Sequence, residues 1–479
     1  MVRRRSRSRG TLDDGAYDVV MPMLEDQPAR DRQSVRTALE SSYGLTLFRG
    51  ALDGPPARAV LALLTRLTAP EPDAVAVARA YSEAFTALAE ARGDLAATLP
   101  DAWQSYLVDA LLDEVNPLSR AAERAGDGAP PPGLRAQAER DLRALRLLFN
   151  LDADTVWRLT VATVTPALPA LTDAWTPWRD LAPPRQTCQA PLETAPRDAF
   201  IRQVEETADW ARLVAPLTAY WSRHGAGPLA RYHALRWEGR EEGLRGIAHP
   251  DGVRLDALVA YEREQALLTN NLERFLAGGP AHDALLYGAP GTGKSSTVKA
   301  LANTYADRGL CLVEARKEDL GDLPAILALL RDRARAYVLF IDDLSFEDDE
   351  TEYKALKVLL EGTAERRPAN VLVHATTNRL NLIRERFSER GKPADDVQWR
   401  DTMDEKASLA ERFGLRVTFA LPDQERYLTI ATALARQRGL TLPEDDLRVR
   451  ALSWQRQHTG RSGRLARQFV DELQGEVVP

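Results

Sequence analysis

The sequence of 479 residues contains only two cysteines, Cys188 and Cys311. Two thiols are too few for a disulfide framework or a zinc site, which favours a reducing compartment. Long apolar runs are also lacking, since the longest one, Leu159 to Leu171, is shorter than a membrane span and contains Pro166 and Pro169. No apolar segment follows the arginines at the N-terminus, so we do not expect a secretion signal there. These absences predict a cytoplasmic protein with no membrane partner.

A large excess of basic residues is absent as well. The chain has 63 lysines and arginines against 70 aspartates and glutamates, and its formal net charge is −7. This balance gives no global argument for nucleic-acid binding, although it leaves local patches open. The arginine-rich residues 1–10 can be an arm that touches nucleic acid or a disordered, solvated tail. The lack of aromatic residues beside the arginines favours the tail.

The composition supplies material for a large globular protein. Hydrophobic residues make up 44% of the chain and charged residues 28%, and the length predicts two or three domains. From about residue 34 to 236 the pattern is helical with proline-rich breaks, and residues 239–252 read as a charged, glycine-containing linker. We therefore predict a mostly helical N-terminal region over residues 1–240, and we find no catalytic constellation in it.

The most informative stretch, Gly288 to Ser295, reads G-A-P-G-T-G-K-S and fits the phosphate-loop pattern G-x-x-x-x-G-K-[ST]. It follows the apolar run Ala284–Tyr287, suited to a buried strand, and precedes a helical pattern from Ser295 to Ala306. Glycines allow a tight turn whose N–H groups cradle phosphate oxygens, and the helix N-terminus adds positive potential. Lys294 would reach the β- and γ-phosphates of ATP, and the Ser295 hydroxyl would bind Mg²⁺. The predicted nucleotide-binding residues are Gly288, Ala289, Pro290, Gly291, Thr292, Gly293, Lys294, Ser295 and Ser296.

Strands and helices alternate after this loop. The predicted strands are Leu310–Glu314, Tyr337–Asp343, Val371–Thr376 and Leu415–Phe419. Helical patterns between them imply crossover connections and a parallel sheet with both faces covered. Before the loop, a helix is predicted over Glu262–Leu276, and its lead-in at residues 255–258 suits an element that folds over the adenine side of the site. We predict an α/β core over residues 241–421 and a helical lid over residues 422–479.

Two acids end the apolar strand Tyr337–Ile341. Asp342 would hold Mg²⁺ through water, and Asp343 could polarise the attacking water. Asn378 follows the next strand and is placed to orient that water, although an asparagine after a strand is often only a turn residue.

With these motifs in place, the chain resembles the AAA+ ATPases over about residues 255–473. The resemblance rests on Gly288–Ser295, Asp342–Asp343, Thr376–Asn378, Leu409–Gly414 and Ser462–Ala466. It implies a P-loop NTPase (AAA+) parallel-sheet core with a C-terminal helical lid. It also implies that Arg412 is an arginine finger facing a neighbouring subunit, and that Arg464 is a sensor residue acting within its own subunit. Local pairing of Arg412 with Glu411 or Asp404 is the alternative.

Several phrases resemble one bacterial AAA+ family that is defined only as a domain of unknown function. They are Asp342–Glu347, Tyr353–Lys357 and Tyr220–Gly225. The second acid differs from the usual glutamate of AAA+ proteins, so the catalytic base is either Asp343 or Glu347. The segment Ala315–Gly321 lacks the aromatic pore residue of threading unfoldases, which argues against a polypeptide-pulling motor.

Together these observations predict a Mg-ATP-dependent ATPase that acts as a remodelling or loading switch. The resemblance implies a homo-oligomer, and the target, a protein or a nucleic acid, stays open. The alternative is a nucleotide-gated scaffold with little turnover that recruits a protein partner through its N-terminal region.

Overall fold

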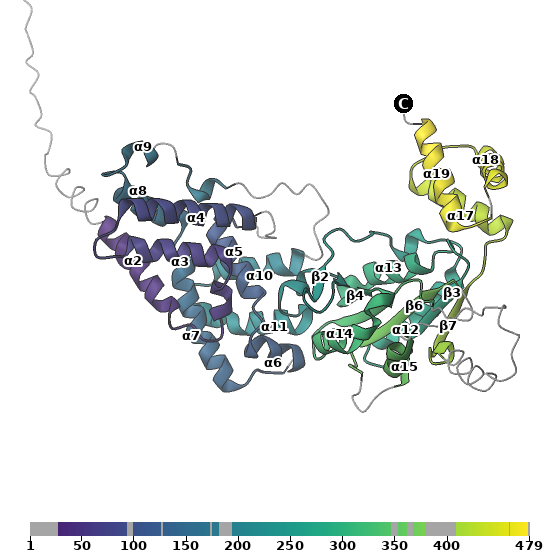
Figure 1. Cartoon of the computed structure of the whole chain (residues 1–479), viewed down its shortest axis with the longest axis horizontal. Coiled ribbons are helices and arrows are strands. Elements are labelled where there is room, and N and C mark those ends of the chain that lie inside the picture. Colours follow the sequence, from purple (N-terminus) through teal and green to yellow (C-terminus); the bar gives the residue numbers. More distant parts are fainter. Residues whose placement is uncertain are drawn as a thin grey trace, which may run out of the picture. The chain divides into compact units, whose positions relative to one another are not determined.

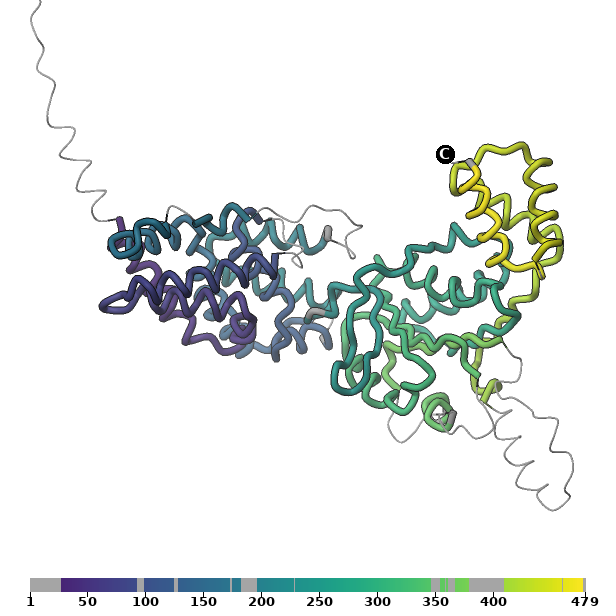
Figure 2. The backbone as a smooth tube through the Cα atoms, turned by 45° about the horizontal axis from the view of Figure 1, so that its top comes forward, coloured from purple at the N-terminus to yellow at the C-terminus, as the bar shows by residue number. Residues whose placement is uncertain are grey.

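The computed structural model describes residues 27–92, 99–125, 128–172, 175–181, 194–345, 353–361, 367–378, 409–458 and 460–477. Its internal contacts divide the chain into two compact units, with the change at Tyr220 and Trp221. Figure 2 traces both backbones, from the purple and blue helices of the first unit to the green sheet and yellow helices of the second.

The first unit is helical. Its helices are α2 (Gln27–Ser42), α3 (Pro55–Leu67), α4 (Ala74–Arg92), α5 (Ala102–Leu112), α6 (Pro117–Ala125), α7 (Pro132–Phe149), α8 (Ala153–Val164), α9 (Pro169–Thr172) and α10 (Thr194–Glu206), and α11 (Val214–His224) runs into the second unit. The mostly helical N-terminal region predicted from the sequence is confirmed.

Buried polar groups fix how these helices meet. The carboxylate of Asp101 caps α5 by accepting from the backbone N–H of Trp103 and also accepts from the backbone N–H of Ala153, at 2.8 and 2.7 Å. The Arg197 guanidinium forms a buried ion pair with Asp109 at 2.6 Å. Such buried contacts specify one packing arrangement, because removing the partners of either carboxylate would leave a charge in the core.

The second unit contains a seven-stranded sheet in the order β2-β1-β4-β5-β6-β3-β7. All neighbouring strands are parallel except β2, which is antiparallel to β1. The strands are β1 (Ala234–Trp237), β2 (Leu244–Gly246), β3 (Ala284–Gly288), β4 (Leu310–Ala315), β5 (Ala336–Ile341), β6 (Val371–Thr377) and β7 (Leu415–Phe419). Its helices are α12 (Glu262–Leu276), α13 (Lys294–Tyr305), α14 (Leu323–Leu330), α15 (Tyr353–Glu361), α17 (Gln424–Gln437), α18 (Glu444–Gln457) and α19 (Gly463–Val477).

Helices cover both faces of this sheet (Figure 1). Alternate strand residues point to opposite faces, so Leu286 belongs to the core under α12 and α13, while Leu285 belongs to the core under α14 and α15. The core under α12 and α13 continues into α17, α18 and α19, the predicted lid. The predicted parallel sheet with covered faces is confirmed.

Two strands differ from the sequence-based prediction. β1 lies within the stretch predicted to be helical, and β2 lies within the predicted linker at residues 239–252. β1 has four residues and β2 has three, too few to show a two-residue period. β1 forms because it pairs with β4, in register from Ala234 opposite Leu312 to Arg236 opposite Glu314. The domain bounds at residues 240/241 and 421/422 stay predictions.

Candidate nucleotide-binding site

The phosphate loop connects β3 to α13. Gly288 has φ +151° and its Cα lies so close to the Phe419 carbonyl that a Cβ there would come within 2.1 Å of its oxygen. Gly293, with φ +93°, occupies the left-handed region immediately before α13. Both conformations favour glycine, so these two glycines are required by the backbone conformation of the loop. The helix begins at Lys294, which leaves its first N–H groups directed toward the loop.

Lys294 is buried, with 6% of its surface exposed. Its Nζ donates to the carbonyl oxygens of Gly288 and Ala289 at 2.8 and 3.0 Å, and to Oδ1 of Asn378 at 2.9 Å. Burial lowers the pKa of the Lys294 ammonium, the carboxylates of Asp342 and Asp343 oppose the shift, and Arg464 adds to it. The lysine is thus a positive charge held in place beside two acids.

The two acids come from the turn after β5 and have different surroundings. Oδ1 of Asp342 accepts from the Ser295 hydroxyl at 2.6 Å and also from the Thr376 hydroxyl. Asp343 has φ +52°, which is uncommon for a residue with a side chain. Its Oδ1 accepts from Nδ2 of Asn378 at 2.8 Å. Asn378 therefore bridges Lys294 and Asp343 with one carboxamide.

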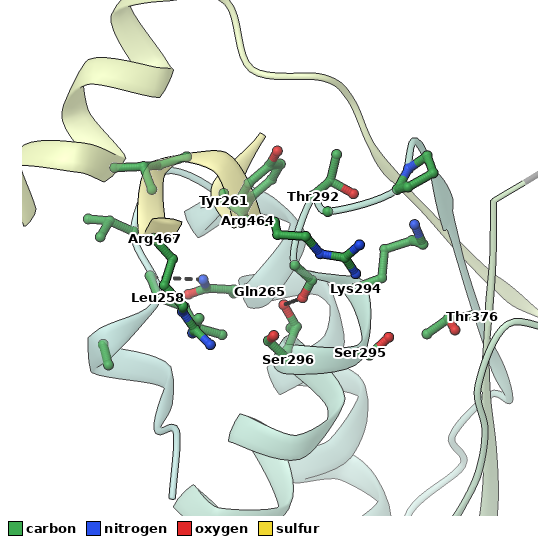
Figure 3. Close-up of a pocket in the computed structure, with 18 of the residues that line it drawn as sticks. Leu258, Tyr261, Gln265, Thr292, Lys294, Ser295, Ser296, Thr376, Arg464 and Arg467 are labelled. Atoms are coloured by element: carbon green, nitrogen blue, oxygen red, sulfur yellow. Dashed lines mark hydrogen bonds between the residues drawn. The ribbon is translucent and has the colours of Figure 1, made fainter. Parts of the chain in front are cut away.

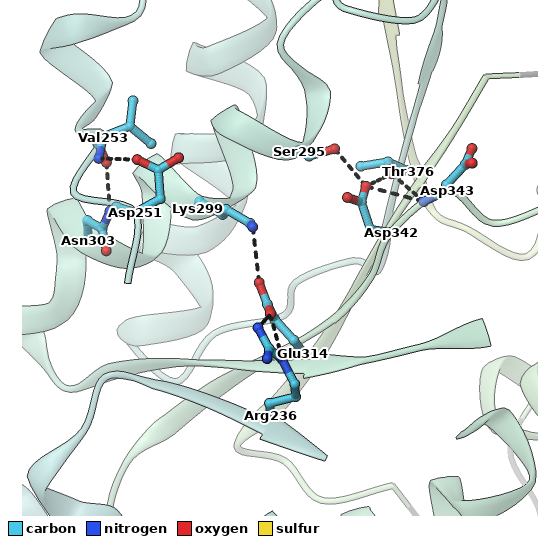
Figure 4. Close-up of polar contacts among 10 residues, drawn as sticks. All are labelled: Arg236, Asp251, Val253, Ser295, Lys299, Asn303, Glu314, Asp342, Asp343 and Thr376. Atoms are coloured by element: carbon cyan, nitrogen blue, oxygen red, sulfur yellow. Dashed lines mark hydrogen bonds and ion pairs between the residues drawn. The ribbon is translucent and has the colours of Figure 1, made fainter. Parts of the chain in front are cut away.

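Thr376 joins the two acids to each other. Besides donating to Asp342, its Oγ1 accepts from the backbone N–H of Asp343 at 2.9 Å (Figure 4). The residue is 1% exposed. A buried hydroxyl that both donates and accepts fixes its partners strongly, because losing either bond would leave a polar group unpaired.

These groups open onto a cavity of about 580 Å³, a usual size for a small-molecule site. Its lining residues come from the loop and α13, the strand ends, the segment before α12, and the helices α17 and α19. They are Ala257, Leu258, Val259, Tyr261, Gln265, Pro290, Gly291, Thr292, Gly293, Lys294, Ser295, Ser296, Thr297, Asp342, Asp343, Thr376, Asn378, Ile430, Leu434, Gly463, Arg464 and Arg467. Figure 3 shows Arg464 extending from α19 toward Lys294.

The donor set fits a divalent metal ion. A serine hydroxyl and an aspartate carboxylate meet at 2.6 Å beside the phosphate loop, and Mg²⁺ in phosphate sites uses one or two such oxygens together with water and phosphate. No cluster of three or more histidine, cysteine, aspartate or glutamate residues with metal-binding spacing occurs in the described part of the chain. Ser295 and Asp342 are therefore suited to a nucleotide-bound Mg²⁺ rather than to an all-protein metal site.

Most of the predicted site residues gather around this cavity. Lys294, Ser295, Ser296, Asp342, Asp343, Asn378 and Arg464 line it, as do Pro290 to Gly293, while Gly288 and Ala289 direct carbonyl oxygens at Lys294. Arg412 follows the short helical turn at residues 409–411 and does not line the cavity in its own chain. Glu347, the alternative base, lies outside the described residues.

Several cavity residues were not predicted as site residues, among them Tyr261, Gln265, Thr376 and Arg467. Thr376 lies inside a strand, and Tyr261, Gln265 and Arg467 lie in helices or at their ends. Two of them carry a signal in the sequence. Thr376 belongs to the segment Thr376–Asn378 on which the AAA+ resemblance rests. Arg467 follows Arg464 by three residues on α19 and so lies on the same helix face.

Strand β6, which carries Asn378 at its end, lies between the loop strand β3 and the acidic strand β5. Together with the phosphate loop and the helices after the sheet, this order defines an AAA+ nucleotide-binding fold. Within that class, residues 230–477 match the family model described as "Protein of unknown function (DUF815)", and the chain belongs to that family. The match starts before β1, so the hairpin β1–β2 is inside it.

Comparison with curated proteins found no match. Among solved structures, the fold is similar to the Holliday junction branch migration motor RuvB of Thermotoga maritima, with 18% identity and a TM-score of 0.34, covering 46% of this chain and 64% of that one. A variant of the same protein gives 17% identity with the same TM-score and coverage. The chain thus spans less than two thirds of the length of these structures. No helix in the described residues is long and apolar enough to cross a membrane.

Proposed function

We propose that this protein is a Mg-ATP-dependent ATPase that hydrolyses ATP to ADP and phosphate. The observation that carries the proposal is the chain of contacts from Lys294 through Asn378 to Asp343, beside the pair of Ser295 and Asp342. In it, a cation for the phosphates, a polar amide and a carboxylate face one cavity.

Each residue has a role in this proposal. The loop N–H groups and Lys294 bind the β- and γ-phosphates, and Ser295 and Asp342 would hold Mg²⁺. A Mg²⁺ ion, when bound, supplies positive charge to the phosphate oxygens. Asn378 orients the attacking water, and Asp343 accepts its proton. The water oxygen forms a bond to the γ-phosphorus, while the bond from that phosphorus to the β–γ bridging oxygen breaks and leaves ADP.

Hydrolysis would drive a remodelling or loading switch on a protein or nucleic-acid target. Arg412 would complete the site of a neighbouring subunit, and Arg464 would sense the nucleotide from the lid of its own subunit. The parallel-sheet fold and the contribution of α17 and α19 to the cavity lining support this proposal.

One observation favours a second candidate, a nucleotide-gated scaffold with little turnover that recruits a partner through the helical first unit. The second acid is an aspartate, one methylene shorter than glutamate, and its Oδ1 is already engaged by Asn378. Steady-state hydrolysis with and without single-stranded DNA separates the candidates, because a loader is stimulated and a scaffold stays slow in both conditions.

The test of the ATPase proposal combines two variants. Lys294→Ala should nearly abolish Mg-ATP binding in calorimetry, because the loop loses its only lysine. Asp343→Asn should bind Mg-ATP as the parent does while hydrolysing it about 10²–10⁴ times more slowly. Unchanged affinity in Lys294→Ala would refute the site. Unchanged turnover in Asp343→Asn, with loss in Glu347→Gln, would move the base to Glu347.

A further inference from the structure

One wall of the cavity is a strap, residues 247–260, which connects β2 to α12 and contains only a short 3-10 turn at Leu255–Ala257. Ala257, Leu258 and Val259 of the strap line the cavity. Connecting segments without regular structure are mobile unless their backbone is fastened. Whatever fastens the strap therefore decides where this wall lies.

Asn303, in the last turn of α13, fastens the strap. Its Nδ2 donates to the carbonyl oxygens of Asp251 and Val253 at 2.6 and 2.7 Å (Figure 4). Its Oδ1 lies 2.8 Å from Nε2 of His233. Since an amide oxygen only accepts, His233 donates from Nε2 in this arrangement. One side chain thus joins α13 to the strap and to the residue that precedes β1.

The fastening continues along the strap. Arg254 donates from its Nη1 to the Asn303 carbonyl oxygen at 3.1 Å, and the backbone N–H of Leu255 donates to Oγ1 of Thr304 at 3.2 Å. Within the wall, Nε2 of Gln265 donates to the Leu258 carbonyl oxygen at 3.0 Å, and Nε2 of Gln437 on α17 donates to the Ala257 carbonyl oxygen at 3.1 Å. The strap is therefore held from α13 ahead of the wall residues, and from α12 and α17 at the wall itself.

α13 also carries the phosphate loop at its other end. Asn303 follows Lys294 by nine residues, which is about 13 Å along a helix axis. A helix keeps that distance constant, so it sets the strap at a fixed separation from the loop. Ile430 and Leu434 of α17 line the same cavity as Leu258 and Val259, and aliphatic side chains of this kind suit a flat heterocycle.

We propose that Asn303 is a positioning residue for the nucleotide base. It holds the strap so that Leu258 and Val259 receive the base of a nucleoside triphosphate whose phosphates bind at the loop. This inference rests on the proposed function, and it adds that base affinity and phosphate affinity are controlled separately. Asn303 does not line the cavity, so its effect on the ligand passes through the strap.

Calorimetry with two probes tests this inference: Mg-ATP, and Mg-tripolyphosphate, which has no base. Asn303→Ala should weaken Mg-ATP binding about 10-fold and leave Mg-tripolyphosphate binding within about twofold of the parent. Thr304→Val, which removes only the acceptor for Leu255, should give a smaller loss of the same kind. It keeps the test decisive if Asn303→Ala does not fold.

Asn271→Ala is the matched control. The Asn271 carboxamide also makes two bonds to loop backbone, both to His282 at 2.8 and 3.0 Å, but that loop precedes β3 and does not line the cavity. This variant should lose thermal stability without changing the affinity ratio of the two probes. Equal weakening of both probes by Asn303→Ala, or unchanged Mg-ATP affinity, would overturn the inference. Failure of the parent to bind Mg-ATP would instead remove the proposed function and this inference together.

Discussion

Thr376 shows what a single buried hydroxyl does in this site. Its Oγ1 donates to the Asp342 carboxylate and accepts from the Asp343 backbone at 2.9 Å. The hydroxyl thus orients the carboxylate expected to hold Mg²⁺ and fixes the backbone of the acid expected to act as base. Asp343 keeps its left-handed conformation, with φ +52°, because the surrounding bonds stabilise it.

We expect Thr376→Val to keep the shape of the side chain and to remove both bonds. Losing a hydrogen bond to a charged group costs about 1.5–3 kcal/mol, so turnover at saturating ATP should fall by roughly 10–100-fold. The Mg²⁺ concentration for half-maximal binding of a fluorescent ATP analogue should rise as well. Thr376→Ser is the control, because it retains the hydroxyl. If the serine and valine variants behave alike in the Mg²⁺ titration, Thr376 only fills space.

At the residue scale, sequence reasoning found the groups that are marked by local spacing. The phosphate loop and the paired acids are contiguous motifs, and the structure brings Lys294, Asp342, Asp343 and Asn378 around one cavity. Thr376 belongs to the segment Thr376–Asn378 that carries the AAA+ resemblance, but its contacts were not predicted, since a threonine inside a strand fits a pleated surface whatever it contacts. Its role arises only when β6 pairs beside β5.

At the scale of elements, the sequence predicted the sheet where strands alternate with long helices. β3, β4, β5, β6 and β7 are all present close to the predicted bounds. The hairpin β1–β2 was missed because pairing with β4, and not local propensity, makes it a strand. The carboxylate of Glu314 on β4 stabilises the pairing of β1 with β4. Its Oε2 lies 3.2 Å from the Arg236 guanidinium on β1, and its Oε1 lies 3.2 Å from Nζ of Lys299 on α13 (Figure 4).

The helix α19 provides a prediction at this scale. The Arg464 backbone N–H donates to the Gly291 carbonyl oxygen at 3.2 Å, which joins the first turn of α19 to the phosphate loop. Its side chain is exposed and lines the cavity. We expect Arg464→Ala to weaken the binding of Mg-ATP more than the binding of Mg-ADP, so that the preference for ATP over ADP falls by about 3–10-fold. The reason is that a cation near the γ-phosphate contributes most when that phosphate is present.

Fluorescence titration with both nucleotides measures this preference. Arg461→Ala is the control, because Arg461 belongs to the same segment but does not line the cavity. If Arg464→Ala and the parent bind and hydrolyse ATP equally, Arg464 is one more exposed arginine.

For the whole molecule, the family match and the compact units divide the chain at similar places. The match begins at residue 230 and the second unit begins at Trp221, while the domain bound at 240/241 stays a prediction. A linker was inferred at residues 239–252 from glycine and charge, but β2, within that stretch, pairs with β1 at the edge of the sheet. The helical first unit shows no motif that identifies a target, and its role stays a prediction.

The last prediction concerns assembly. Arg412 lies between the turn at residues 409–411 and β7, and it does not line the cavity of its own chain. If it completes the site of the neighbouring subunit, Arg412→Ala and Lys294→Ala should each be inactive alone. Fingers of this kind contribute about 10³–10⁵ in rate. A mixture of the two variants should recover hydrolysis, because some interfaces then pair an intact loop with an intact arginine.

The mixing experiment needs proof that hybrid oligomers form, which two different affinity tags provide through co-purification. Phosphate release is then measured at several mixing ratios, and the rate should be highest near equal amounts. The double variant Arg412→Ala, Lys294→Ala, mixed with either single variant, is the control, because no interface in those mixtures contains both intact groups. If Arg412 instead pairs locally with an acid such as Glu411, the mixture should not recover hydrolysis. In that case hybrid oligomers form and stay as inactive as each parent variant, and the arginine acts only within its own chain.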